Sequence, residues 1–183
     1  MLQTTYYEVA KRLERIDFPS IWPGFSSGPF ALYQEKLACL NGRLVPRPPE
    51  FRGNTAISWQ GSPLAIWDLE EEMDLDRLAS YLVHELFHAH QLAAGETRFP
   101  QDILLALSPA PLPSLASRLQ EGRLLAQAAS AGPDAALSYL TDFCALRRQR
   151  QERPECLQEC LVETVEGTAE FVGLQALRML SPE

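Results

Sequence analysis

The sequence predicts one α+β domain, in which a small and mostly antiparallel sheet precedes a long helix and a mainly helical C-terminal half. Three observations lead to this fold class. Short runs rich in β-branched and aromatic residues alternate with turn residues up to about residue 67. Helical periodicity then continues over about residues 74 to 94. From Pro100 onward, no segment has the pattern of a strand.

The chain begins with a predicted helix and a predicted loop. Residues 3 to 16 have amphipathic helical spacing, which ends at Asp17-Phe18-Pro19. Residues 21 to 29 are rich in proline and glycine and are expected to form a loop. Five short strands are predicted after it, at residues 30–33, 37–40, 43–45, 55–59 and 64–67.

Two turn sequences predict how these strands pair. Asn41-Gly42 separates the second strand from the third, and this dipeptide is the strongest short signal for a β-hairpin. Gln60-Gly61-Ser62 separates the fourth strand from the fifth. We therefore expect two hairpins in a largely antiparallel sheet. A helix over residues 30 to 39 is the competing interpretation of the first two strands.

Helices account for the rest of the chain. Acidic residues crowd the start of the helix at 74 to 94, where they favour the helix dipole and can supply an N-cap, and Gly95 can close its other end. Three more helices are predicted, at residues 112–131, 134–151 and about 154–180. The Gly132-Pro133 pair separates the first two of these, and Pro154 suits the first turn of the last.

Composition limits the kind of protein. The chain has 183 residues, of which 46% are hydrophobic, so it can bury one substantial core. Its net charge of −8 makes nucleic acid a poor candidate partner, since the phosphate backbone would be repelled. No leader pattern opens the sequence, and no segment approaches the roughly 18 apolar residues of a membrane span. A cytoplasmic protein without membrane contact is expected.

Two further features have ordinary interpretations. The four cysteines are expected to be free thiols, because disulfide frameworks belong mainly to small secreted domains. Cys156 and Cys160 lack a second Cys/His pair nearby and are expected to be buried and reduced. The basic run at residues 147 to 153 falls near a predicted helix end, where a solvated position is expected.

The most specific pattern is His84-Glu85-Leu86-Phe87-His88, an H-E-x-x-H sequence inside the helix at 74 to 94. Residues four apart on a helix lie about 40° apart around the axis and about 6 Å apart along it, so two imidazoles can converge on one metal ion. Glu85 is rotated out of the ligand pair but remains close enough to act on a water molecule. The pattern therefore supplies two metal ligands, His84 and His88, and a general base, Glu85.

The same histidines could instead be ordinary polar residues on the wet side of an amphipathic helix. An apolar stripe suited to a core already runs along this helix, at Leu75, Leu78, Leu82 and Leu86. Against this, the polar face combines aromatic, basic and amide side chains, as the lining of a cleft does, and is not the Lys/Glu-rich face typical of a solvent-exposed helix. Its residues are Arg77, Tyr81, His84, His88 and Gln91. His90 follows His88 by about 200° and should face away from the ion.

A catalytic zinc site needs a third protein ligand. The metzincin pattern H-E-x-x-H-x-x-G-x-x-H is excluded by Gln91 and Ala94, so a carboxylate remains. The last predicted helix carries four glutamates within an arc of about 60°, at Glu159, Glu163, Glu166 and Glu170. By itself such a stripe is an ordinary solvated face. Its like charges repel, however, so a metal ion or arginines from the preceding helices are expected nearby.

At this point the sequence resembles a family. The segment Val165-Glu166-Gly167-Thr168-Ala169-Glu170-Phe171 resembles the Glu-Gly-x-Ala-x-aromatic segment of gluzincin metallopeptidases, in which a second helix presents a glutamate as third zinc ligand. The resemblance implies a zincin-like fold with Glu166 as that ligand. It also implies that Gly167 and Ala169 permit close helix approach and that Phe171 takes the aromatic place. More weakly, residues 54 to 61 are similar to the edge strand beside the substrate cleft of thermolysin-like enzymes.

The chain departs from the family in its spacing. Glu166 follows His88 by far more residues than in the best-known gluzincins, so residues 97 to 153 are predicted to be a helical insert that folds over or beside the cleft of a single domain. Glu163 and Glu170 remain alternatives to Glu166. The group that would hydrogen-bond the transition state is unassigned, with candidates Tyr81, Tyr139 and Arg98.

Together, these features predict a zinc metallopeptidase. The residues His84, His88 and Glu166 would hold Zn²⁺, and Glu85 would take a proton from water and pass it to the leaving amine. The substrate would be a peptide lying along the strand that contains Ala56. One alternative is a zincin-like protein that binds a metal or a partner without turnover. Another is a di-iron helical bundle, but no histidine outside residues 84 to 90 can complete a second E-x-x-H.

Overall fold

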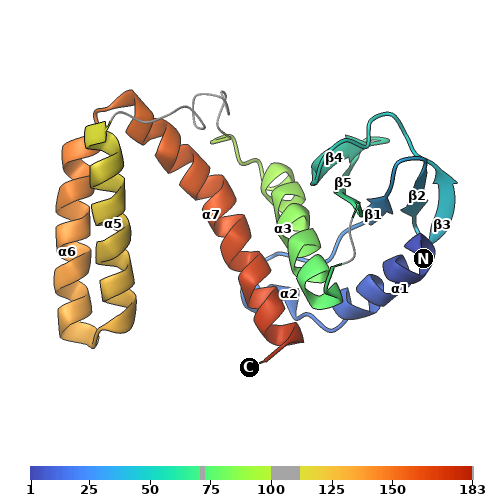
Figure 1. Ribbon diagram of the computed structural model, residues 1–183, viewed down its shortest axis with the longest axis horizontal. Helices are drawn as coiled ribbons and strands as arrows, with labels where there is room; N and C mark the ends of the chain where they lie inside the picture. The colour runs from blue at the N-terminus through green and yellow to red at the C-terminus, as the bar shows by residue number, and fades with distance from the viewer. Residues whose placement is uncertain (71–72, 100–111, 183) are drawn as a thin grey trace. The chain divides into compact units, whose positions relative to one another are not determined.

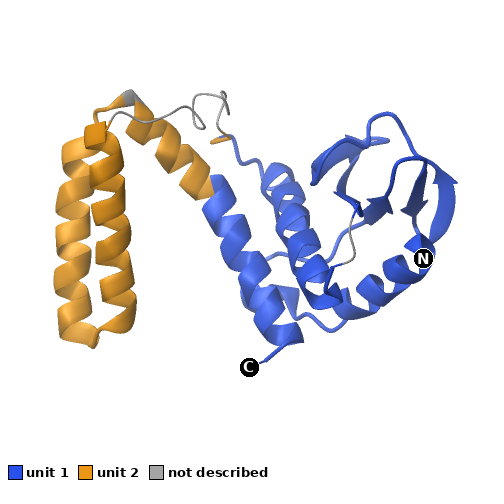
Figure 2. Ribbon diagram, in the orientation of Figure 1, with its two compact units in different colours: residues 1–97, 165–183 blue, residues 98–164 orange. Residues whose placement is uncertain are grey.

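The computed structural model describes residues 1–70, 73–99 and 112–182. It comprises two compact units, which Figures 1 and 2 show. Unit 1 consists of Met1–Thr97 and Val165–Glu183, and unit 2 of Arg98–Thr164. The last helix, α7 (Pro154–Leu180), begins in unit 2 and continues into unit 1. The fold class is α+β with a mainly helical C-terminal half, as the sequence predicts.

Unit 1 contains a five-stranded sheet. Its strands are β1 (Phe30–Tyr33), β2 (Leu37–Leu40), β3 (Arg43–Pro46), β4 (Thr55–Trp59) and β5 (Ser62–Asp68). They lie in the order β3-β2-β1-β5-β4, so β4 is at an edge. All neighbours are antiparallel except β1 and β5, which are parallel. The sheet is therefore mixed, and mostly antiparallel as predicted.

Both predicted hairpins are confirmed by their backbone angles. Asn41-Gly42 has φ values of 49° and 73°, and Gln60-Gly61 has 50° and 83°. Two successive left-handed residues are the conformation of a type I′ turn, whose twist matches that of the strands. The alternative helix over residues 30 to 39 is wrong, because β1 forms ladders with a strand on each side and its residues are held extended.

The helices of unit 1 begin with α1 (Leu2–Leu13) and α2 (Phe18–Ile21). The first ends earlier than the predicted residue 16. The second lies in a segment where no helix was predicted. Pro19 occupies its first turn, where backbone N–H groups have no partner within the helix, so proline loses no hydrogen bond there.

The motif helix α3 (Leu75–Ala93) has the ends that the sequence predicts. The Asp74 carboxylate accepts hydrogen bonds from two backbone N–H groups of the first turn. At the other end, Gly95 has a φ of 80°, and the N–H of Glu96 donates to the carbonyl oxygen of Gln91 at 2.9 Å. This is the Schellman arrangement, in which glycine takes the left-handed position.

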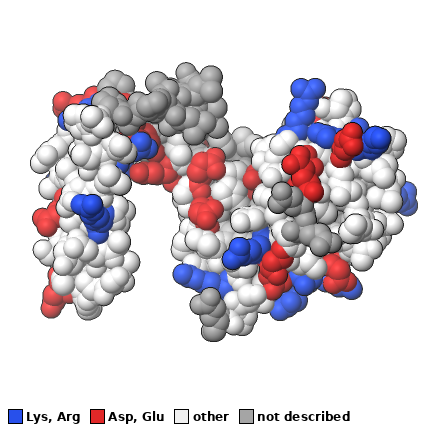
Figure 3. Space-filling model, viewed as in Figure 1, with Lys and Arg blue, Asp and Glu red and all other residues white. Residues whose placement is uncertain are grey.

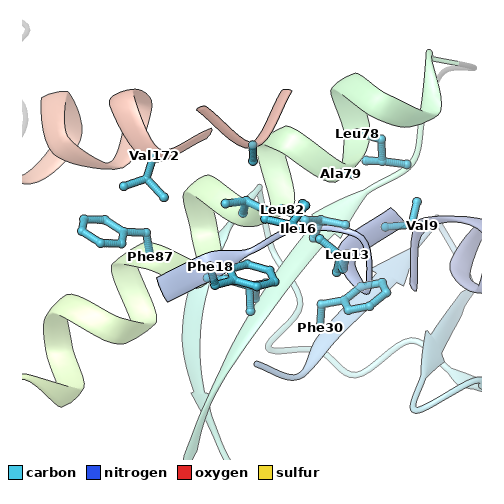
Figure 4. Close-up of a cluster of buried hydrophobic side chains, with 14 of the residues drawn as sticks. Val9, Leu13, Ile16, Phe18, Phe30, Leu78, Ala79, Leu82, Phe87 and Val172 are labelled. Atoms are coloured by element: carbon cyan, nitrogen blue, oxygen red, sulfur yellow. The ribbon is translucent and has the colours of Figure 1, made fainter. Parts of the chain in front are cut away.

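The main core of unit 1 lies among α1, α3, β1 and the second part of α7 (Figure 4). Val9 from α1, Phe30 from β1, Leu82 from α3 and Val172 from α7 are all buried in it. Shortening a leucine such as Leu82 to alanine in a core costs about 2–5 kcal/mol of folding free energy. Because the leucine stripe of α3 fixes this helix in the core, its polar face is turned away from the core.

Unit 2 is helical. It comprises α5 (Leu112–Ser130), α6 (Pro133–Arg150) and the first part of α7. The break between α5 and α6 falls at Gly132, which is the N-cap of α6. The predicted helices and their order are therefore confirmed.

A network of arginines and glutamates lies inside unit 2. Arg150 is only 1% exposed and pairs with Glu121 of α5, at 2.8 Å, and with Glu159 of α7. Arg147 pairs with Glu121 at 2.7 Å and with Glu163 at 2.8 Å. The expectation of a solvated basic run is wrong for these two arginines, because carboxylates on both neighbouring helices offer the partners that a buried guanidinium requires.

The cysteines follow the prediction in part. All four cysteines are free thiols, as expected. Cys156 is buried as predicted, whereas Cys160, which was also predicted to be buried, is only partly buried. Among the helices of the described residues, none combines the length and the apolar character needed to cross a membrane.

Candidate metal centre

Three potential ligand atoms converge where α3 and α7 face each other in unit 1. The Nε2 atoms of His84 and His88 lie 3.0 Å apart. The Oε2 atom of Glu166 is 3.4 Å from the first nitrogen and 3.3 Å from the second. The structure thus brings together the three side chains that the sequence predicts as metal ligands.

The spacing of these atoms suits a zinc ion. With bonds of about 2.0–2.2 Å, neighbouring ligand atoms of a tetrahedral zinc site lie about 3.3 Å apart. The two distances to Glu166 match this value, and the 3.0 Å between the histidine nitrogens is slightly shorter. Two imidazoles and one carboxylate also form one of the usual donor sets of catalytic zinc. The residues present therefore fit this metal in both geometry and chemistry.

The helices α3 and α7 run antiparallel beside each other within unit 1 (Figure 1). The two helices pack closely at Gly173, where an added Cβ would lie 3.1 Å from the carbonyl oxygen of Ser80 and 3.5 Å from the Cβ of His84. The sequence does not single out this glycine. The sequence does contain one signal for it. Gly173 is a small residue seven positions after Glu166, so it lies two turns further along the same face of the helix.

The prediction that Gly167 permits close helix approach is wrong. Gly167 is exposed, and nothing lies within 4 Å of the position its Cβ would take. The face of α7 that packs in the core is instead formed by residues on the other side of the helix, namely Val165, Ala169, Val172 and Ala176. Ala169 is completely buried, which agrees with its predicted place, whereas Phe171 is 48% exposed.

Gln91 holds His88 in a metal-binding orientation. Its side-chain amide nitrogen donates to the backbone carbonyl of Val165 at 3.1 Å and to the Thr168 hydroxyl at 2.9 Å. Because a carbonyl can only accept, the amide oxygen of Gln91 must face His88 Nδ1, which lies 2.8 Å away. Nδ1 therefore carries a proton, and Nε2 is the ring nitrogen that faces the ligand group and is free to bind a metal ion when it is deprotonated.

This supporting role of Gln91 was not predicted. From the sequence, Gln91 is expected only to lie on the polar face of the motif helix. The available signal was its spacing, because a residue three positions after a histidine lies beside it on the same helix face. Gln91 is also only 8% exposed, and a buried amide needs hydrogen-bond partners.

The four stacked glutamates of α7 divide into two pairs. In unit 2, Glu159 and Glu163 meet arginines. In unit 1, Glu166 and Glu170 face histidines, and the Oε2 of Glu170 lies 3.6 Å from His84 Nδ1. Acidic side chains gather over α7 on the face that Figure 3 shows. The expectation of arginines near the glutamates is therefore confirmed for Glu159 and Glu163. The expectation of a metal ion beside Glu166 stays a prediction.

Glu85 is buried next to the ligand group. It is 8% exposed, and burial raises the pKa of its carboxyl group. The nearby His84 and His88 lower this pKa and Glu166 raises it, but burial dominates. A carboxyl group whose pKa is moved toward neutrality is better suited to exchanging protons during a reaction.

The charges of the ligand group are mutually supporting. Hydrogen bonds with His84 and His88 hold the pKa of Glu166 well below its usual range, so this side chain is ionised at neutral pH. Burial opposes the protonated form of His88, but hydrogen bonds to Glu166 and Gln91 outweigh it and raise the pKa of this imidazole. Glu166 is therefore in the form that binds a metal ion.

A pocket of about 230 Å³ adjoins the ligand group on the side of His84. Its lining comes from α3 and α7, namely Arg77, Ser80, Tyr81, His84, Glu170, Gly173, Leu174 and Leu177. We call it the His84 pocket. Three of the polar-face residues of the motif helix line it, which supports their interpretation as a cleft lining.

Other predicted residues lie at different distances from this site. His90 packs against the rings of Phe25 and Phe87, with centroids 5.3 and 5.5 Å away, and so faces away from the ligand group as predicted. Tyr81 stacks on the indole ring of Trp67 at the pocket wall. The other two candidates for a transition-state donor, Tyr139 and Arg98, belong to unit 2 and stay predictions.

Comparisons with protein-family models, with curated proteins and with solved structures found no match. The chemistry of this site must therefore be inferred from the side chains that form it.

Proposed function

We propose that this chain is a zinc-dependent peptidase of the zincin-like kind, with His84, His88 and Glu166 as metal ligands and Glu85 as general base. The observation that carries the proposal is the convergence of three ligand atoms at tetrahedral spacing, 3.0 to 3.4 Å apart. Two features add support. The histidines belong to an H-E-x-x-H sequence, and the carboxylate next to the first of them is buried beside the group.

Each residue has a distinct part in the proposed reaction. A bound zinc ion would act as a Lewis acid on the scissile carbonyl and on water. Glu85 accepts a proton from the attacking water on its carboxylate and delivers it to the nitrogen of the leaving amine. Gln91 keeps His88 in the tautomer that binds through Nε2. Glu166 contributes negative charge to the ligand set.

The edge strand β4 supports a peptide substrate. An edge strand presents unpaired N–H and C=O groups, which can pair with an extended chain. β4 is at the edge of the sheet and contacts α3, the helix that carries the histidines. We propose that a peptide lies along this strand, which contains Ala56, so that one of its carbonyl groups reaches the ligand group.

The proposal is tested by zinc content and peptide cleavage together. The purified full chain should retain about one zinc ion per molecule, measured by mass spectrometry of the metal after desalting. It should also cleave members of a peptide library prepared by digesting denatured proteins. The variant Glu85→Gln should keep the zinc and lose cleavage, because the residue is assigned to proton transfer. Glu35→Gln, an exposed carboxylate between β1 and β2, is the matched control and should behave as wild type.

Other outcomes would favour the alternatives. Zinc at one equivalent, with no cleavage of any library peptide, would favour a zincin-like protein that binds a metal or a partner without turnover. Two iron ions per chain would contradict both zinc readings and favour a di-iron centre. The donor set weighs against that last outcome, since the group of described residues able to hold an ion contains one carboxylate and two histidines.

A further inference from the structure

We infer that the His84 pocket binds one ligand residue that carries a carboxylate, and that Arg77 holds this carboxylate. The inference rests on the proposed function for its biological meaning, since the pocket would then select peptides by the residue next to the cleaved bond. The carboxylate can come from a peptide C-terminus or from an acidic side chain. Its binding to Arg77 can be measured independently of catalysis.

The pocket connects the ligand group to Arg77. His84 belongs to both the ligand group and the pocket lining. Arg77 precedes His84 by two turns of α3, which places the two on the same face of the helix and about 10 Å apart along it. The Arg77 side chain covers part of that distance. The remainder corresponds to one or two residues of extended chain, at about 3.6 Å each.

Arg77 contributes a positive charge to the lining of the His84 pocket. It forms no ion pair with any carboxylate among the described residues, whereas Arg12 pairs with the adjacent Asp76 at 2.7 Å. Arg77 lies in the first turn of α3, where a positive charge opposes the helix dipole. A cation at this position is therefore not explained by the helix dipole, and an anionic ligand in the pocket would complement it.

The rest of the lining is suited to one apolar residue. Leu174 and Leu177 of α7 contribute aliphatic surface, and Leu174 is 45% exposed. Tyr81 adds an aromatic ring, which its stacking on Trp67 fixes in place. The volume of about 230 Å³ is below the roughly 300–1,000 Å³ of pockets that take drug-sized ligands. A single side chain is the appropriate size.

The pocket is also electrically polarised. Glu170 lies at the end near His84, with its Oε2 atom 3.6 Å from His84 Nδ1. A ligand carboxylate is repelled from that end and attracted to Arg77 at the other. An occupant is thus oriented with its carboxylate away from the ligand group, which leaves its preceding amide bond on the side of His84 and Glu166.

The first test is binding to the full chain in the presence of a chelator, so that no metal ion can hold the carboxylate. The probes are N-acetyl-leucine, its amide, and N-acetyl-glutamic acid α-amide. The binding of each probe is measured by NMR titration. One charge-assisted contact of this kind corresponds to about a tenfold difference in Kd. We expect wild type to bind N-acetyl-leucine or the glutamate probe about tenfold more tightly than the leucine amide, and the tighter of the two identifies the source of the carboxylate.

Two variants complete this test. Arg77→Gln should remove the preference for a carboxylate. Arg43→Gln, which changes an exposed arginine of β3, should retain it. Equal binding of acid and amide by wild type, or a preference that persists in Arg77→Gln, would overturn the inference.

A second test separates the pocket from catalysis. If the zinc-loaded chain cleaves peptides, those with a free C-terminus one or two residues beyond the cleaved bond should react faster than their C-terminal amides. In a parallel series, peptides with an acidic residue one or two positions beyond the cleaved bond are compared with peptides that carry the corresponding amide residue there. Arg77→Gln should abolish whichever preference wild type shows. If no peptide is cleaved at all, the proposed peptidase function fails. The binding experiment still shows whether the His84 pocket binds a carboxylate through Arg77.

Discussion

The Ser80 hydroxyl donates a hydrogen bond of 2.9 Å to the backbone carbonyl oxygen of Gly173, where α3 and α7 pack closely. This contact is one helical turn from His84 and nearly one turn from Glu170. The distance between the two helices at this point therefore determines how closely the glutamates of α7 approach the histidines of α3.

The variant Gly173→Ala should weaken zinc binding and destabilise the fold. Its Cβ would lie 3.1 Å from the carbonyl oxygen of Ser80, so the helices must separate by a few tenths of an ångström. Overpacking of this kind costs about 1–3 kcal/mol. Gly167→Ala is the matched control, because it lies in open space on the same helix and should stabilise by about 0.5–1 kcal/mol. Urea denaturation and a competitive zinc titration measure both effects, and equal behaviour of the two variants would refute the assigned contact.

Replacing Gln91 by leucine should lower zinc affinity by about 10- to 100-fold, the usual effect of losing a partner that orients a ligand. The reason is the hydrogen bond of 2.8 Å that fixes the tautomer of His88. Titration against a chelator of known affinity gives the change. An unaltered affinity would mean that His88 is oriented by packing alone.

Among the stacked glutamates, only Glu166→Ala should remove the metal. Glu170→Ala removes a charge 3.6 Å from His84 Nδ1 and should cost no more than about 10- to 100-fold in affinity. Glu163→Ala should leave zinc binding unchanged, because Glu163 pairs with Arg147 in unit 2. Competitive titration of the three variants decides the order, and loss of metal in Glu170→Ala with retention in Glu166→Ala would reverse the assignment.

The stability of unit 1 should depend on pH through Asp76. The Ser181 hydroxyl donates to this carboxylate at 2.7 Å, and Arg12 pairs with its other oxygen at 2.7 Å, so the pKa of Asp76 lies below its ordinary value. A lowered pKa stabilises the fold above about pH 4, the value for an unfolded aspartate, and this contribution is lost as the pH falls through the folded pKa.

At pH 7, Asp76→Asn should therefore cost about 1 kcal/mol, and the difference from wild type should shrink below about pH 4. Urea denaturation over a pH series measures it. Glu14→Gln, an exposed carboxylate after the end of α1, is the control and should show no such trend. A difference that is constant with pH would show that the charge of Asp76 is not the source of the effect.

Local signals in the sequence predict most of this fold. Asn41-Gly42 determines a hairpin within a few residues, and Asp74 and Gly95 mark the ends of the motif helix, because capping depends on neighbouring backbone groups. The parallel pairing of β1 with β5 was not predicted, since it joins strands that are separated in the chain by three others. Such a pairing depends on packing, which no short pattern records.

The site was predictable to a similar extent. His84 and His88 are four residues apart, so helix geometry alone brings them together. Glu166 came from the resemblance of its segment to a family, and the structure places it beside both histidines. Gln91, Gly173 and the burial of Arg150 depend on which faces of distant helices meet, and were therefore missed or misjudged.

The order of synthesis has a consequence for this site. His84 and His88 leave the ribosome long before Glu166, because the whole of unit 2 lies between them in the chain. A nascent chain that ends before α7 is complete carries the H-E-x-x-H sequence without its carboxylate partner. Any ion that it binds is held by two imidazoles alone, with the weaker affinity of an incomplete ligand set. In the proposed enzyme, hydrolytic activity is therefore expected only after Glu166 has been synthesised and has joined the two histidines.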